Sequence, residues 1–301
     1  MLPSDPVAWG LLEQLGVAAR DRNAVLAARP DPHEQPGLWL ALEQNLSDAL
    51  NNMGEPPPRF VSWQPPATGV GRAARHLSVW TFLATLPYVR KYHALHEVPD
   101  EISWETLGFL GAAMRSYRER TGLSGVGLSG GLALTARGVS YRLGRLAFDR
   151  HVAVNPGSAM DVAAASQKTS LRVHIPAASG RLDPDACDRA FAEARLFFPD
   201  RFPEHITSFS CRSWLMDAQL GDYLPHDSNI RRFQQRFTTF TDVETADWSP
   251  LDHIFQIRPV AQELLDELPQ VTTLQRAVVA HLRAGRHWYL RTGWVPFELA
   301  R

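Results

Sequence analysis

The sequence predicts an α+β protein in which a helical N-terminal domain precedes a mixed-sheet domain. Apolar residues recur at helical spacing from about residue 5 to residue 122, and the hydrophobic period then changes to that of strands. From 171 to 240 a strand, a helix, a strand and a further helix follow in close order. The chain has 301 residues, about twice the length of a common domain. We therefore place the two domains at 1–122 and 123–301.

The first domain shows helical patterns separated by a proline-rich connector. Two helix faces are predicted near the N-terminus, one by Trp9, Leu12, Leu15 and Ala19 and one by Leu38, Leu42, Leu46 and Leu50. Residues 54–69 contain five prolines and form the connector, because proline cannot continue a helix. Helical periodicity resumes near residue 72, with Pro87 as a break or kink, and a helix over 103–120 ends at Gly122.

The second domain is expected to open with a hairpin. Residues 125–154 alternate between apolar and polar side chains, and Arg137-Gly138 is suited to the turn. Residues 155–169 are small and polar, which is typical of a mobile loop.

The segment 171–240 carries the strongest pattern. Residues 171–176 alternate as a strand that Pro176 terminates, and Asp183-Pro184 then begins a helix with one buried face. A second strand falls within 205–217, and Asp227-Ser228 follows as the cap of a helix over 229–237. A β-α-β-α run implies neighbouring strands, a crossover helix and a cleft at the strand ends.

Three further elements complete the chain. Residues 251–257 are expected to form a strand, and 292–299 a closing strand. Between them, Thr272 and Gln275 form a capping-box pair ahead of a helix that Gly285 closes.

Composition excludes several classes of function. The formal net charge of −1 offers no broad attraction for nucleic acid or an anionic membrane. Two cysteines support no disulfide framework, and no Cys/His cluster has metal-ligand spacing. The first residues do not have the pattern of a signal peptide, and no stretch approaches 18 uncharged apolar residues. A cytoplasmic protein without a metal or tightly bound cofactor is therefore expected.

Several segments resemble a bacterial acyltransferase family with a helical N-terminal domain and a GNAT-like C-terminal domain. These are HIPA…GRLDPDACDRA, CRSWLMDAQL, LPHDSNIRRFQQRF and LPQVTTLQRAVVAHLRAG, and the resemblance covers about 125–301 well and the first 120 residues more loosely. The resemblance implies a mixed sheet with helices on both faces, whose two central strands splay apart to admit an acyl thioester. By order, those strands are 171–176 and 208–215.

The resemblance also implies a donor site after the first of these strands. Its backbone N–H groups would bind pantetheine and pyrophosphate, in the run Ala178, Ser179, Gly180 and Arg181. The usual Q/R-x-x-G-x-G/A run is missing here, and Asp183 and Asp185 place negative charge near a bound pyrophosphate. The co-substrate is therefore either acyl-CoA or an acyl group on the phosphopantetheine of a carrier protein. The alternative is that Ser179-Gly180 is a simple turn.

Acyl transfer to an amine needs a base, and His174 on the first central strand has a suitable side chain. The alternative is a hydrogen-bonded structural histidine. Ser213 either hydrogen-bonds a reacting group or caps the helix expected to begin near Asp217, and the cap is favoured. Tyr223 follows the second strand, where GNAT enzymes often have a tyrosine acid for the departing thiolate.

Three further candidates have competing interpretations. Asn229 either helps its helix cap or bonds the pantetheine arm, and Arg232 and Arg236 either bind phosphate or form an ordinary solvated face. Cys211 is either a covalent nucleophile or a buried structural residue, and the second is favoured because free cysteines are among the most buried residues. Cys187 falls on the apolar face of its helix.

The first functional hypothesis is an acyltransferase that moves an acyl group from a thioester to an amine-type acceptor by direct attack. The alternative is a catalytically inactive GNAT-like binding module that docks a carrier protein or a small ligand. A small-molecule amine acceptor is expected in the first case. An acyl-carrier protein and a homodimer stay open as partners.

Overall fold

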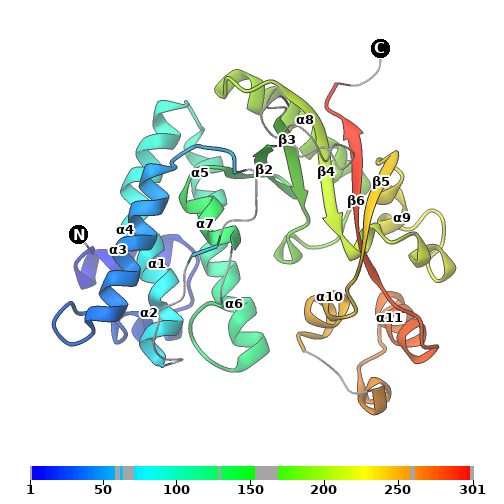
Figure 1. Ribbon diagram of the computed structural model, residues 1–301, viewed down its shortest axis with the longest axis horizontal. Helices are drawn as coiled ribbons and strands as arrows, with labels where there is room; N and C mark the ends of the chain where they lie inside the picture. Colours follow the sequence, from blue (N-terminus) through cyan, green and yellow to red (C-terminus); the bar gives the residue numbers. More distant parts are fainter. Residues whose placement is uncertain are drawn as a thin grey trace, which may run out of the picture. The chain divides into compact units, whose positions relative to one another are not determined.

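The computed structural model describes residues 2–57, 62–63, 71–127, 130–152, 169–257 and 262–298 (Figure 1). Its chain contacts divide it into two compact units, residues 1–142 and 143–301. Most of the proline-rich connector at 54–69 and nearly all of the loop predicted at 155–169 lie outside the described residues.

The first unit is built from helices around one apolar core. The helices are α1 Asp5–Gln14, α2 Ala19–Leu26, α3 Pro36–Asn51, α4 Arg72–Leu95, α5 Asp100–Leu107, α6 Phe109–Thr121 and α7 Gly130–Ala136. Trp80 on α4 is fully buried, and its indole N–H donates to the backbone oxygen of Val25 at 3.1 Å. This bond satisfies the one polar atom of a large apolar side chain, so Trp80 packs α4 against the end of α2 without the free-energy cost of an unpaired buried N–H.

Several predicted helices have different bounds in the structure. The face that includes Leu15 and Ala19 belongs to two helices, because α1 ends before Leu15. The helix expected at 103–120 is α5 and α6, which meet at Gly108, and α6 ends at Gly122 with φ 69° as predicted. Pro87 does not break α4, since buried side chains on both sides of it pack in the same core.

The expected hairpin turn at Arg137-Gly138 is wrong. Residues 130–136 form helix α7, and Gly138, with φ 65°, follows it in the position of a helix terminator. The amide of Gly138 donates to the Thr135 carbonyl at 3.1 Å, and the amide of Val139 donates to that of Leu134 at 3.1 Å. Short apolar runs do not distinguish a buried helix from a strand, and here α7 packs against α4, α5 and α6. Helix α7 thus lies in the first unit, beyond the boundary at 122 drawn from the sequence.

The second unit contains a mixed sheet, except for the first residues of its first strand, which precede the boundary at 143. Its strands are β1 Ser140–Leu143, β2 Leu146–Val152, β3 Thr169–His174, β4 Ile206–Ser213, β5 Thr239–Thr245 and β6 Tyr289–Pro296, in the order β1-β2-β3-β4-β6-β5. The pairs β2–β3, β4–β6 and β5–β6 are antiparallel, whereas β3 and β4 are parallel. The predicted crossover is therefore confirmed: β3 leads through α8 (Pro184–Arg201) to its parallel neighbour β4 (Figure 1).

Helix α8 covers one face of this sheet. Directly paired residues share a face, as do alternate residues of one strand. Phe148 of β2 pairs with Val173 of β3, and Phe209 of β4 pairs with Leu171, two residues from Val173, so all four lie on one face. Phe191 of α8 meets them, with ring centroids 5.9 Å from Phe148 and 4.9 Å from Phe209. Edge-on aromatic contacts of this kind bury large apolar area and fix the helix over the strands. The opposite face carries Asp149 and His151 of β2, Arg172 and His174 of β3, and Ser210 of β4.

The end of the chain differs from the sequence prediction in two places. Residues expected to form a strand at 251–257 instead form a π-helical turn, Leu251–Phe255, after the short helix α10 (Trp248–Pro250). The apolar side chains of this segment all pack in one cluster: Leu251, Ile254, Phe255 and Ile257. In a strand, neighbouring side chains such as Ile254 and Phe255 would instead point to opposite faces. Strand β5 was not predicted, whereas helix α11 (Thr273–Arg283) with its capping box and strand β6 were.

The remaining short elements follow the strands. They are the 3₁₀ turns η1 Ala177–Ser179, η2 Trp214–Met216, η3 Ala218–Asp222 and η5 Gln262–Glu267, and the helix α9 Asn229–Gln234. No helix in the described part of the chain is long and apolar enough to cross a membrane.

Candidate active site at the splayed ends of β3 and β4

Strands β3 and β4 separate at their carboxyl ends. Their pairing runs from Thr169 opposite Ile206 to Arg172 opposite Ser210. Beyond that point, His174 pairs only with β2, and the last residues of β4 pair only with β6. The last residues of β3 and β4 therefore do not pair with each other, as expected of two parallel neighbours that part after a shared start. This is the splay that the family resemblance implied for 171–176 and 208–215.

His174 is the last residue of β3, beyond its pairing with β4, and it contacts a buried carboxylate. Its Nε2 is 2.5 Å from Oδ2 of Asp149 on β2. The His174 side chain is 47% exposed, whereas that of Asp149 is 5% exposed. One partner can therefore meet a reactant while the other is shielded from water. Asp149 was not singled out in the sequence, although a carboxylate in the middle of an apolar strand is an unusual residue.

The register of β2 and β3 explains this pairing. Ala147 lies opposite His174 and Asp149 lies opposite Arg172, so Asp149 is the diagonal neighbour of His174 on the same face. Arg172 lies beside the carboxylate and donates from Nη2 to Nε2 of His151 at 2.8 Å. Burial lowers the pKa of Arg172, and the nearby Asp149 charge opposes that shift.

The hydrogen bond to Asp149 decides which ring nitrogen of His174 is available. A carboxylate only accepts, so Nε2 of His174 carries the proton in this pair. Nδ1 then holds the lone pair, and it has no partner among the described residues. A neutral imidazole in this tautomer can take a proton from a reactant at Nδ1, while Asp149 stabilises the imidazolium that forms.

The loop after β3 contains the predicted donor-binding residues. Ala178 and Ser179 belong to η1, and Gly180 follows with φ 74° and ψ −152°, a conformation that glycine adopts readily. The amide of Ser179 donates to the Pro176 carbonyl at 3.2 Å. The Arg181 side chain is exposed and has no partner in the part of the chain that the structure describes.

The start of α8 offers little to an anion. Pro184 has no N–H, and the carboxylate of Asp183 accepts the amide of Ala186 at 2.9 Å. The negative charge of Asp183, expected from the sequence, therefore lies at the N-terminus of α8, where a bound anion would otherwise lie. Any pyrophosphate must rely on the loop before α8.

Helix α9 packs beside the first turns of α8. Arg236, after α9, donates from Nε to Asp188 at 2.8 Å and from Nη2 to the Pro184 carbonyl at 2.9 Å. Its side chain is thus used to attach α9 to α8, and it does not join Arg232 in a shared phosphate site. Within the described residues, neither the exposed Arg232 side chain nor the half-buried Asn229 side chain has a partner.

Ser213 and Tyr223 have other contacts. The Ser213 hydroxyl accepts the amide of Leu215 at 3.1 Å and caps η2, whereas the turn that begins after Asp217 is capped by Asp217 itself. The Tyr223 hydroxyl lies 3.0 Å from Nδ1 of His281, whose Nε2 lies 3.1 Å from the His287 carbonyl. Because the carbonyl can only accept, Nε2 carries the ring proton and Tyr223 donates to Nδ1. None of the described contacts of Tyr223 reaches His174.

Neither cysteine has the environment of a nucleophile. Burial raises the pKa of Cys211 to about 12, and its side chain lies on the α8 face of the sheet, opposite to that of His174. Burial also raises the pKa of Cys187. A thiol in such surroundings stays protonated near neutral pH and is a poor nucleophile.

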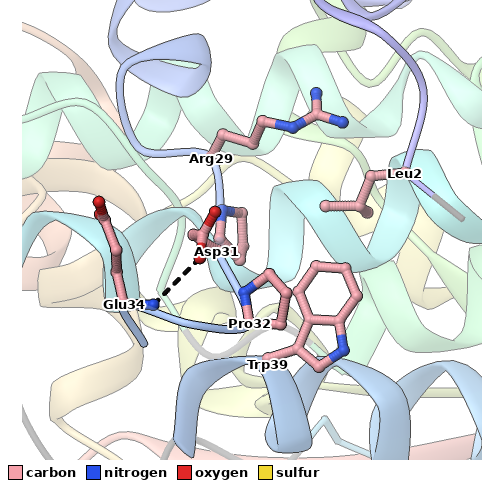
Figure 2. Close-up of a pocket in the computed structure, with 7 residues that line it drawn as sticks. Leu2, Arg29, Asp31, Pro32, Glu34 and Trp39 are labelled. Carbon is pink, nitrogen blue, oxygen red and sulfur yellow. Dashed lines mark hydrogen bonds between the residues drawn. The ribbon is translucent and has the colours of Figure 1, made fainter. Parts of the chain in front are cut away.

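A separate pocket lies in the helical unit and includes none of the predicted site residues. Figure 2 shows it between Leu2, Arg29, Asp31, Pro32, Glu34 and Trp39. Arg29 is engaged with the Asp5 carboxylate at 2.9 Å and with the Pro3 carbonyl at 2.7 Å, so its charge is already compensated. Across the described residues, no cluster of His, Cys, Asp or Glu has the arrangement of a metal site.

Comparison with known proteins agrees with this architecture over nearly the whole chain. The family model of the N-acyltransferase N-terminal domain matches residues 8–137, and that of the GNAT-like C-terminal domain matches residues 140–295. No curated protein matches the chain.

Solved acyltransferase structures are also similar. A mutant acyltransferase in complex with octanoyl-CoA is 37% identical, with a TM-score of 0.87 over 98% of this chain and 89% of that one. An acyltransferase in complex with decanoyl-CoA and teicoplanin is 38% identical, with a TM-score of 0.86 over 99% and 90%. A third, with CoA and 10C-teicoplanin, is 37% identical with a TM-score of 0.87, again over 99% and 90%. The chain belongs to the N-acyltransferase family that joins an N-acyltransferase N-terminal domain to a GNAT-like C-terminal domain, and it is an acyltransferase.

Proposed function

We propose that this enzyme transfers an acyl group from acyl-CoA to the amine of a small-molecule acceptor, with His174 as the general base. The observation that carries the proposal is the hydrogen bond between the half-exposed His174 and the buried Asp149 at the open end of β3 and β4. A base in this position can reach an acceptor bound against a thioester that lies in the V.

The choice of acyl-CoA over an acyl-carrier protein is supported by the relatives, which hold octanoyl-CoA, decanoyl-CoA or CoA. In this chain the missing Q/R-x-x-G-x-G/A run is replaced by a loop followed by a capped helix. Arg181 and Arg232 are exposed charges on the loop and on α9, and both are suited to the phosphates of CoA. Ala178, Ser179 and Gly180 would supply the loop backbone, and Asn229 would face the pantetheine arm.

The reaction proceeds by direct attack. The acceptor nitrogen forms a bond to the thioester carbonyl carbon, and its proton passes to Nδ1 of His174. The tetrahedral intermediate then collapses, the C–S bond breaks, and the proton held by His174 returns to the CoA thiolate. Asp149 stabilises the imidazolium between these two steps. The buried, protonated Cys211 supports this route over an acyl-enzyme.

The nature of the acceptor follows from two findings. The matched family is described as N-acyltransferase, which supports a nitrogen nucleophile. Two of the solved relatives hold teicoplanin or 10C-teicoplanin, which supports a small-molecule acceptor rather than a protein. We therefore propose a small molecule with a primary amine, and teicoplanin is the first acceptor to test.

The test measures release of free CoA thiol from octanoyl-CoA and decanoyl-CoA in the presence of teicoplanin and simple primary amines, with the product identified by mass spectrometry. His174→Gln should lower kcat by about 10²- to 10⁴-fold, the usual contribution of a general base. His205→Gln is the matched control, because His205 is exposed at the start of β4 and should leave kcat unchanged.

Two results would contradict the proposal. Unchanged turnover in His174→Gln would remove the base. Transfer from an acyl-carrier protein without transfer from any acyl-CoA would show that the donor is a carrier protein.

A further inference from the structure

Arg145 is a buried arginine that holds the loop between β3 and α8. It lies in the turn between β1 and β2, directly after Gly144, which has φ 53°, and only 8% of its surface is exposed. Its guanidinium donates to three carbonyl oxygens of that loop: Nη1 to Pro176 at 3.1 Å, Nη2 to Gly180 at 3.0 Å and Nε to Arg181 at 2.8 Å. A planar fork of donors is suited to such a set of bonds, which a lysine cannot reproduce.

These bonds also orient the amides of the loop. In a trans peptide the N–H points away from the C=O of the same unit, and the described residues contain no cis peptide. The three carbonyls that face Arg145 therefore turn the amides of Ala177, Arg181 and Leu182 away from it. None of these three N–H groups has a hydrogen-bond partner among the residues that the structure describes.

We propose that Arg145 is the positioning residue for the nucleotide end of the donor: it aims these three amides at the pyrophosphate of acyl-CoA. The inference rests on the proposed use of acyl-CoA and adds the residue that shapes its phosphate site. Arg145 does not touch the donor itself. It acts through the loop backbone, which it orients in place of the Q/R-x-x-G-x-G/A run that GNAT enzymes usually have.

Two features of this chain make such a residue necessary. The start of α8 is occupied by its own Asp183 cap and begins with Pro184, so the loop has to supply the donors. Gly180 keeps a backbone conformation that other residues rarely adopt, and a Cβ added there would meet nothing within 4 Å. The loop is thus set by backbone geometry and by Arg145, with open space around it for a ligand.

The test compares two donors that differ only in the nucleotide. Dissociation constants are measured without acceptor for octanoyl-CoA and for octanoyl-pantetheine, and their ratio is the nucleotide preference of the enzyme. Arg145→Gln should lower this preference at least about tenfold, the loss of one charge-assisted hydrogen bond, by weakening octanoyl-CoA alone. Arg145→Lys should lower it in the same way, because the three N–H groups of an ammonium share one nitrogen and cannot replace donors on three separate guanidinium nitrogens.

Arg137→Gln is the matched control. Arg137 is 5% exposed and likewise donates to backbone carbonyls, those of Asn52 at 3.2 Å and Glu55 at 3.4 Å, but it lies in the helical unit. This variant should lose stability and keep the wild-type nucleotide preference. Gly180→Ala changes the backbone of the loop without removing a buried side chain, and it should lower the nucleotide preference. This variant tests the inference if the Arg145 variants do not fold.

Each outcome has one meaning. An unchanged preference in Arg145→Gln and Gly180→Ala overturns the inference, as does an equal loss for both donors. Wild-type protein that binds octanoyl-pantetheine as tightly as octanoyl-CoA also overturns it. Wild-type protein that binds neither donor contradicts the proposed function itself.

Discussion

The pairing of His174 with Asp149 predicts a large kinetic effect from a small change in one side chain, Asp149→Asn. The substitution removes the negative charge from a site where Nε2 and Oδ2 are 2.5 Å apart. For charge centres about 4 Å apart, the attraction between carboxylate and imidazolium is about 1 kcal/mol in water and about 4 kcal/mol at an effective dielectric constant of 20. Asp149 is buried and the His174 side chain is 47% exposed, so solvent screens only one partner. We expect about 2–3 kcal/mol, or a loss of about 30- to 150-fold in kcat.

A second effect acts in the same direction. The side-chain amide introduced by Asp149→Asn can rotate so that its NH₂ group donates to Nε2 of His174. The ring proton then moves to Nδ1, and the base is blocked. Asp149→Glu keeps the charge and should recover part of the activity, which a purely structural role for Asp149 would not predict.

The assay is steady-state release of CoA thiol by wild type, Asp149→Asn, His174→Gln and the double variant. If Asp149 acts through His174, its substitution should cost little more once His174 is absent. Glu204→Gln is the matched control, because Glu204 makes an ion pair with the buried Arg150 at 2.8 Å, away from the splay. The reasoning is refuted if folded Asp149→Asn keeps kcat within threefold of wild type, or if the two substitutions are additive.

Three other predictions concern groups elsewhere in the molecule. Burial lowers the pKa of His93 to about 3, so below about pH 6.5 the unfolded state binds a proton that the folded state does not bind. The free energy of unfolding should therefore fall as pH drops below about 6.5, by up to about 1.4 kcal/mol per pH unit, and urea unfolding of His93→Gln should show a weaker dependence on pH. Cys211→Ala should keep kcat within about threefold while losing about 1–2 kcal/mol of stability, and an acyl adduct on Cys211 seen by intact mass after rapid quench would disprove the direct route. Tyr223→Phe should lower the free energy of unfolding by about 1–3 kcal/mol, because Nδ1 of His281 loses its donor, and should change kcat less than threefold. A larger drop in kcat at unchanged stability would instead support Tyr223 as the acid that protonates the thiolate.

Local features of the chain were predictable because they depend on neighbouring residues. Helix starts are marked by Asp183 with Pro184, by Asp227-Ser228 and by Thr272 with Gln275. The caps are present at Asp183, Ser228 and Thr272. The parallel pair around α8 followed from the same kind of reasoning, since a strand, a helix and a strand in close order leave few arrangements. The negative charge at the start of α8 was also visible in the sequence.

Segments with one short apolar run were not predictable in this way. Residues 130–136 and 251–255 are helical, although both were expected in extended structure. In 130–136 all residues but one are buried, and in 251–255 the three apolar side chains pack in one cluster, so the period that separates helix from strand is missing. The choice was made by the helices and clusters that surround them.

The sequence by itself determined the family, the crossover at the heart of the second unit and the candidacy of His174. Only the tertiary structure decided that Asp149 is the partner of His174, because that contact depends on the register of β2 against β3. It also decided that Arg145, 31 residues or more away along the chain, holds the loop between β3 and α8. Local patterns report which face a side chain takes, whereas strand order and register decide which distant side chains meet there.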